Sequence, residues 1–149
     1  MPGHSKDEAR RALEAFPRGV FLLTASFANK RCGQLVQSVQ TCAEEPMLVC
    51  VAARKGHPIA PLIRDAHHFG ICMLDPEDRF VPRYFGPGTG SKGDPFDALE
   101  VDRLASGAPV IRRSLAALDC QVVRHLDVEA DHELYIGQVL AGRVYPKRT

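Results

Sequence analysis

The chain has 149 residues, 45% of them hydrophobic and 25% charged, and its formal net charge is +1. This length suits one hydrophobic core, so we expect residues 1–149 to form a single domain. The balanced charge, with no block of Lys or Arg, argues against a nucleic-acid partner. The longest apolar runs, Val20–Leu23 and Met47–Ala53, are too short to cross a membrane. Because the first residues also lack the apolar core of a signal peptide, we expect a cytoplasmic protein with no membrane partner.

The cysteines and histidines form no recognisable metal or redox motif. None of the five cysteines stands in a Cys-x-x-Cys pair, and the six histidines lack the spacing of metal ligands on a helix. We therefore predict reduced thiols and no metal site. Cys42 lies close to the polar strand described below, and we predict that it takes no part in chemistry.

The first half of the chain predicts one helix and three strands. Ser5 and Glu8 have the spacing of a capping box, and apolar residues follow at helical spacing until Pro17 ends the helix after Phe16. A turn is predicted at Asn29–Gly33. The predicted strands are Arg18–Phe27, Gln34–Thr41 and Met47–Ala53.

The second half adds three short helices and three strands. Helices are predicted over Pro58–Asp65, Pro76–Phe85 and Pro95–Ala105, with a glycine-rich loop at Gly86–Asp94. The predicted strands are Phe69–Leu74, Ala116–Asp127 and Glu133–Val144. Because strands outnumber helices and follow one another directly, the pattern favours a Greek-key or meander barrel.

Polar residues occupy the middle of the predicted strand Gln34–Thr41. Gln37, Ser38 and Thr41 would cost free energy if they were buried without hydrogen-bond partners. A heteroaromatic ligand with several donors and acceptors would compensate that cost. The alternative is an edge strand whose polar side chains face water.

A basic stretch, Ala53–Pro58, leads into the start of a predicted helix. Arg54, Lys55 and His57 supply cationic donors there, and the helix start supplies backbone N–H groups. This chemistry suits a phosphate group. The alternative is an ordinary basic turn exposed to solvent.

Taken in order, four segments resemble the flavin reductase-like, FMN-binding split-barrel family. They are Phe16–Val20, Gly33–Pro46, the run His57-Pro58-Ile59 followed by Ile63, Arg64 and Phe69, and Ala130–Val139. The last segment is similar to the family's Gly-Asp-His-x-x-x-x-Gly-x-Val motif, although Ala130 replaces its first glycine. The family's Ser-Ser-Phe is here Gln37-Ser38-Val39.

The resemblance implies a mainly β fold, a six-stranded split β-barrel of Greek-key type with short helices, and a homodimer with flavin at the interface. The implied cofactor is FMN, with FAD as a further possibility, and the electron donor is NADH or NADPH. The residues implied in cofactor binding are Gln37, Ser38 and Val39 at the pyrimidine edge of the ring, Thr41 on the ribityl or phosphate side, Ala53, Arg54, Lys55 and His57 around the phosphate, and His132 beside the ring or the nicotinamide. The alternative for His132 is a turn histidine that pairs with Asp131.

Three functions from different classes remain open at this stage. The first is an NAD(P)H:flavin reductase that supplies reduced flavin, with a partner oxygenase as one destination. The second is a non-catalytic FMN electron carrier that docks a redox partner. The third is a non-redox β-barrel binding module. The first needs no catalytic side chain, because hydride passes directly from a nicotinamide to the flavin.

Overall fold

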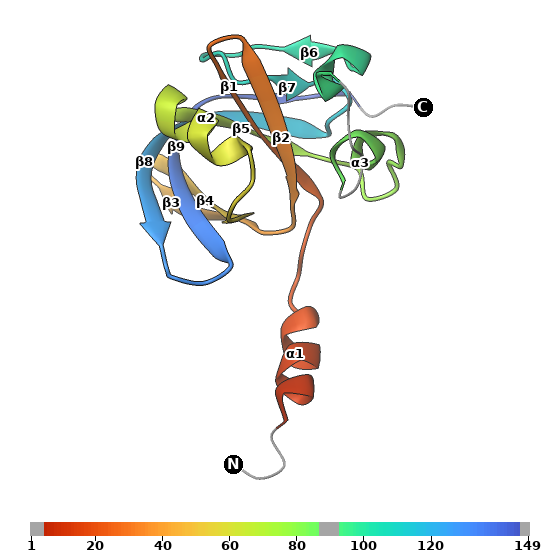
Figure 1. Ribbon diagram of the computed structural model, residues 1–149, viewed down its shortest axis with the longest axis vertical. Helices are drawn as coiled ribbons and strands as arrows, with labels where there is room; N and C mark the ends of the chain where they lie inside the picture. Colours follow the sequence, from red (N-terminus) through yellow and green to blue (C-terminus); the bar gives the residue numbers. More distant parts are fainter. Residues whose placement is uncertain (1–4, 87–92, 147–149) are drawn as a thin grey trace.

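The computed structural model describes residues 5–86 and 93–146, and its main feature is a strongly curved sheet of seven antiparallel strands (Figure 1). Along the sheet the order is β2-β1-β5-β8-β9-β4-β3. The strands are β1 (Phe21–Phe27), β2 (Lys30–Val36), β3 (Val39–Glu44), β4 (Met47–Arg54), β5 (His68–Met73), β8 (Ala116–Asp127) and β9 (His132–Val144). The expected mainly β, split-barrel architecture is confirmed, with one strand more than the six expected.

The helices are short and lie outside the sheet. They are α1 (Lys6–Glu14), α2 (Ile59–Ala66), α3 (Phe80–Phe85) and the 3-10 turn η1 (Pro95–Ala98), and a two-stranded ribbon follows, β6 (Val101–Asp102) with β7 (Val110–Ile111). Figure 1 shows α1 standing away from the barrel and α2 lying across it. In the part of the chain that the structure describes, no helix combines the length and apolarity needed to cross a bilayer.

The extra strand arises because the predicted strand Gln34–Thr41 is broken. Gln37 and Ser38 belong to no strand, so the run divides into β2 and β3. β2 pairs with β1 and β3 pairs with β4, which places these two consecutive strands at opposite edges of the sheet. The break is therefore the seam of the barrel, where the chain passes from one edge to the other.

One side-chain contact crosses this seam in place of a strand ladder, and two backbone hydrogen bonds extend the pairings on either side of it. The Gln34 amide accepts a hydrogen bond from the backbone N–H of Arg54 at 2.7 Å and donates to the Arg54 carbonyl at 3.4 Å. Gln34 is buried, with only 6% of its surface exposed. The Gln37 carbonyl accepts from the N–H of Gly19 at 3.0 Å, and the Ser38 carbonyl accepts from the N–H of Ala52 at 3.3 Å.

Strand alternation directs one face of each strand into the barrel. On β4, Val49, Val51 and Ala53 are buried, whereas the residues between them are half-buried. Phe69 and Tyr135 pack with ring centroids 6.3 Å apart in the same core. Since successive side chains of a strand point to opposite faces, Cys50 and Ala52 lie on the outer face of β4.

Several expected boundaries were wrong for local reasons. The turn lies at Ala28–Asn29, where both residues have positive φ as a two-residue hairpin requires, so β2 already begins at Lys30. Helix α3 begins at Phe80 instead of Pro76, because the carboxylate of Asp78 accepts from the first N–H groups of the helix.

Two other segments differ from expectation as well. The helix predicted over 95–105 is confined to η1, and the ribbon β6–β7 follows it. Most of the predicted loop Gly86–Asp94 lies outside the described residues.

Gln34→Ala tests the seam. The variant removes the acceptor of the Arg54 N–H, so we expect the free energy of unfolding to fall by about 1–3 kcal/mol in urea titrations. The exposed Gln121 on β8 is the matched control, because Gln121→Ala should change stability by less than about 0.5 kcal/mol. Equal effects of the two variants would contradict the role given to Gln34.

Candidate functional site

A cavity of about 770 Å³ lies along the seam of the barrel. This volume falls within the range of small-molecule sites in proteins. The cavity brings together five of the nine predicted site residues, Gln37, Ser38, Arg54, His57 and His132. The other lining residues come from the segment before β1, from β2, from β4 and from α3: Gly19, Val20, Gln34, Leu35, Val36, Ala52, Pro82, Phe85 and Gly86.

One wall of the cavity is the strand break itself. The Gln37 side-chain oxygen accepts a hydrogen bond from the guanidinium of Arg18 at 3.3 Å, which orients the amide. Ser38 follows and also lines the cavity. The carbonyls of both residues are already bonded to Gly19 and Ala52, so what the break can offer a ligand is mainly the side chains of Gln37 and Ser38.

Arg54 and His132 face the cavity from neighbouring strands. They are direct partners in the pairing of β4 with β9. His132 Nδ1 also lies 2.9 Å from the carboxylate of Asp131, so the pairing with Asp131 and the position beside the cavity occur together. The hydrogen bond from His132 and, more weakly, the charge of Arg54 hold the pKa of Asp131 below its usual value.

His57 lines the cavity, and internal contacts occupy one of its ring nitrogens. Its Nδ1 accepts a hydrogen bond from the N–H of Ile59 at 3.1 Å and lies 3.9 Å from the sulfur of Cys32. Burial lowers the pKa of His57, which favours the neutral ring. Because Nδ1 is an acceptor, the neutral ring carries its proton on Nε2 and can donate from there.

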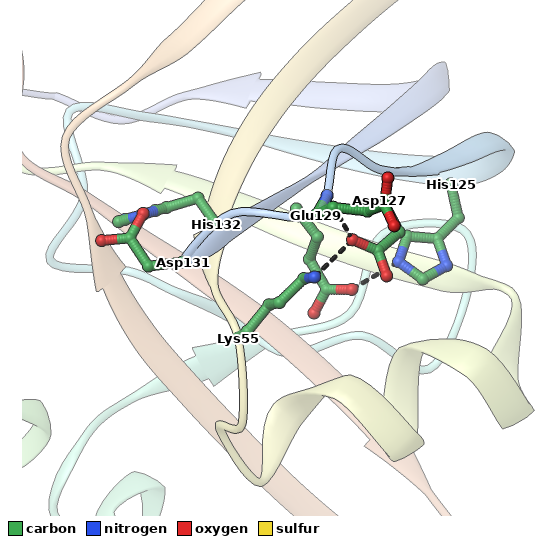
Figure 2. A network of polar contacts seen from close by, with 7 residues as sticks. Lys55, His125, Asp127, Glu129, Asp131 and His132 are labelled. Atoms are coloured by element: carbon green, nitrogen blue, oxygen red, sulfur yellow. Dashed lines mark hydrogen bonds and ion pairs between the residues drawn. The ribbon is translucent and has the colours of Figure 1, made fainter.

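Lys55 does not line the cavity, contrary to its predicted place beside Arg54. Its ammonium pairs with the carboxylate of Asp127, and its N–H donates to the Asp131 carbonyl at 3.0 Å. Figure 2 shows Lys55 turned toward Asp127, with Asp131 and His132 to its left. Lys55 lies in the turn that follows Arg54, the last residue of β4, and these two contacts hold it at the β8–β9 hairpin.

Three further predicted residues are not brought to the cavity. Val39 packs against the inner core, Ala53 is 1% exposed within that core, and Thr41 is an exposed residue of the edge strand β3. Their roles in cofactor binding stay predictions without support from the cavity lining.

A second polar cluster lies at the same end of the β8–β9 hairpin (Figure 2). His125 Nε2 is 2.5 Å from the buried carboxylate of Glu133, and the His125 ring stacks on Tyr135 with centroids 4.6 Å apart. Burial and the nearby Glu133 raise the pKa of Tyr135 to about 12. None of these three residues lines the seam cavity, and their mutual contacts hold the hairpin together.

Sequence reasoning missed Gln34, Arg18 and Phe85. A signal for Gln34 exists, because it alternates with the buried Val36 and therefore shares the inward face of its strand. A polar residue on that face requires an internal partner. Arg18 and Phe85 carry no comparable signal, since their proximity to the cavity depends on segments distant in the sequence.

The geometry defines a split barrel with a cavity along its seam, lined by Gln37 and Ser38 at the strand break and by Arg54, His57 and His132. The model of the flavin reductase like domain family matches residues 13–149. The chain belongs to this family.

Two curated relatives and a solved structure are similar over most of the chain. A ferric-chelate reductase (NAD(P)H) of Archaeoglobus fulgidus is 25% identical over 138 residues, covering 89% of this chain and 80% of the relative. The FMN reductase (NADH) SmoA of Agrobacterium fabrum is 30% identical over 138 residues, covering 93% of this chain and 76% of the relative. The structure of a nitrilotriacetate monooxygenase component B homologue from Mycobacterium thermoresistibile has a TM-score of 0.82 and 26% identity. The match covers 97% of this chain and 78% of the other.

The lowered pKa of His57 predicts a pH dependence of stability. The unfolded chain takes up a proton on His57 near the ordinary value of 6.5, whereas the folded chain does so only at lower pH. The free energy of unfolding should therefore fall as the pH drops below about 6.5. Urea titrations between about pH 8 and about pH 5 should show a smaller fall for His57→Asn than for the wild type. Identical pH profiles would contradict this assignment.

Proposed function

We propose that this protein is an NAD(P)H-dependent flavin reductase that binds its flavin in the seam cavity. The observation that carries the proposal is the arrangement of that cavity, with Gln37 and Ser38 at the strand break and Arg54 and His57 beside them. Relatives named ferric-chelate reductase (NAD(P)H) and FMN reductase (NADH) support the reaction class.

The donor set fits the ring of a flavin. The pyrimidine edge of that ring alternates carbonyl and N–H groups, and an amide side chain can both donate and accept. Gln37 and Ser38 would hold this edge, while Val36 and Phe85 supply apolar surface in the same cavity. When bound, the flavin accepts hydride from the reduced nicotinamide.

The donor set also fits the flavin phosphate. Arg54 contributes a permanent positive charge, and His57 contributes its Nε2–H. His132, paired with Asp131, would contact the ring or the nicotinamide from the β9 side. The residues of this chain bind and orient, and the reaction requires no side-chain nucleophile.

A second copy of the chain fits the outer face of β4 and β9. Cys50, Ala52 and Arg54 on β4 are directly paired with Ile136, Leu134 and His132 on β9, and all except Arg54 are half-buried. The apolar part of this face continues into the cavity lining, so a homodimer would place the flavin at its interface. Light scattering of the flavin-bound protein that gives the mass of one 16.4 kDa chain would contradict the homodimer.

A partner enzyme and a cytoplasmic location complete the proposal. The similar structure of a nitrilotriacetate monooxygenase component B homologue supports delivery of reduced flavin to an oxygenase. A reducing cytoplasm suits a chain with five unpaired cysteines. A non-catalytic electron carrier remains the second candidate, because the same cavity could retain FMN tightly.

Turnover separates the two candidates. We expect the purified protein to oxidise NADH or NADPH continuously when FMN or FAD is added in excess, measured by the loss of nicotinamide absorbance. The carrier alternative predicts a flavin absorbance spectrum in the purified protein and a single stoichiometric reduction. No flavin binding at all would leave only the binding-module hypothesis.

The phosphate assignment predicts a selective loss of affinity. The double variant Arg54→Ala and His57→Ala should weaken FMN at least about tenfold more than riboflavin, which lacks the phosphate. Fluorescence titration measures both dissociation constants. Lys55→Ala is the matched control, because Lys55 is held by Asp127 outside the cavity and should leave the ratio unchanged. Equal losses for the two ligands in the double variant would place the phosphate elsewhere.

A further inference from the structure

The segment between α1 and β1 is fixed against the strand break by its backbone. The N–H of Gly19 donates to the Gln37 carbonyl at 3.0 Å. A β-carbon at Gly19 would lie 2.5 Å from the ring of Phe21, so the backbone approaches the barrel closely at this point. Arg18 directly precedes Gly19 and is therefore held beside Gln37.

The guanidinium of Arg18 determines which end of the Gln37 amide remains for a ligand. Its Nη1 donates to the side-chain oxygen of Gln37 at 3.3 Å. A guanidinium has donors and no acceptor, so only the oxygen of the amide can face it. Gln37 lines the seam cavity, whereas Arg18 is not among the lining residues. The amide NH2 of Gln37 makes no hydrogen bond within residues 5–86 and 93–146, so it is the group left for a ligand.

Arg18 also brings a positive charge to the rear of this amide. No carboxylate in the described part of the chain forms an ion pair with Arg18. A hydrogen bond from a cation is stronger than one between neutral groups, and it polarises the amide that accepts it. The N–H groups at the other end of the Gln37 side chain therefore become stronger donors.

We propose that Arg18 is a positioning residue that makes Gln37 a donor to a ring carbonyl of the flavin. The proposal rests on the proposed flavin site and divides the ring contacts within it. Gln37 donates to a carbonyl oxygen, and the hydroxyl of Ser38 is left to accept from the ring N–H. Since Gln37 replaces the first serine of the Ser-Ser-Phe motif, this amide is a feature of the present chain and not of the motif.

The same arrangement favours the reduced flavin over the oxidised one. Two-electron reduction increases the negative charge on the carbonyl edge of the ring, and a polarised donor binds that edge more tightly after reduction. Charge close to this edge is one means by which a protein sets the potential of a flavin. We therefore expect Arg18 to raise the midpoint potential of the bound flavin.

Riboflavin tests the positioning role, because it carries the ring without the phosphate. Arg18→Met removes the donor but keeps most of the side-chain stem, and it should raise the dissociation constant of riboflavin about fivefold in fluorescence titrations. Arg18→Lys keeps a donor and the charge and should bind riboflavin within about twofold of the wild type. In a Gln37→Met background, Arg18→Met should have no further effect, because the group that it positions is gone. Arg11→Met on α1 is the control for loss of an exposed arginine.

Gln37→Glu separates positioning of a donor from simple anchoring of the segment. The carboxylate keeps the contact with Arg18 and strengthens it, but it has no N–H to donate, so the dissociation constant of riboflavin should rise at least about tenfold. A side chain that only anchors the segment would tolerate this change.

The midpoint potential gives a readout that does not depend on turnover. The potential of bound FMN should fall in Arg18→Met and stay at the wild-type value in Arg18→Lys. A fivefold greater loss of affinity for the reduced than for the oxidised form corresponds to about 20 mV for a two-electron couple.

The outcomes distinguish this proposal from the flavin site on which it rests. Unchanged riboflavin binding and potential in Arg18→Met, or equal losses from Arg18→Met in the wild-type and Gln37→Met backgrounds, would overturn the positioning role and leave the flavin site intact. Unchanged riboflavin affinity in Gln37→Glu would overturn the donor assignment. If the wild type binds neither riboflavin nor FMN, both proposals fail.

Discussion

The bidentate contact of the Gln34 amide with the backbone of Arg54 is the interaction on which the rest of the structure depends. A sheet that curls into a barrel must either continue its ladder across the closing edges or leave them unpaired. Here one side chain supplies both a donor and an acceptor to the facing strand, at 3.4 Å and 2.7 Å. The contact holds the two strands together at this point, and both Gln34 and Arg54 also line the cavity beside it.

The break between β2 and β3 and the end of β4 determine which residues line the cavity. Gln37 and Ser38 leave the ladder where β2 ends, so their polar groups face the seam. On the facing strand, alternation sends Ala53 into the core and Arg54 to the cavity, while the following Lys55 reaches Asp127. Two adjacent basic residues thus have different surroundings, Arg54 at the seam cavity and Lys55 at the β8–β9 turn.

Much of this could be predicted from the sequence, and what was missed has a physical reason. Alternation, apolar runs and the order of the motifs identified the barrel, the long strands and the polar segment around Gln37. A break between two strands changes no residue type and leaves no periodic signal, so Gln34–Thr41 was predicted as one strand. The composition of Ala53–Pro58 likewise indicated phosphate chemistry but not the direction of each side chain. Lys55 is set apart from Arg54 by its contacts with Asp127 and Asp131, which are distant in the sequence.

The loop after β4 directs its side chains into different surroundings. In the order of the chain, Arg54 and His57 face the seam cavity, Lys55 binds the β8–β9 turn, and Pro58 faces the cavity beside α2. Fixing Lys55 to Asp127 removes conformational freedom from the loop, since both its ammonium and its N–H are bound to that turn. The same loop therefore sends Arg54 and His57 to the seam cavity and Pro58 to the side beside α2, and the anchored Lys55 fixes the path of the chain between them.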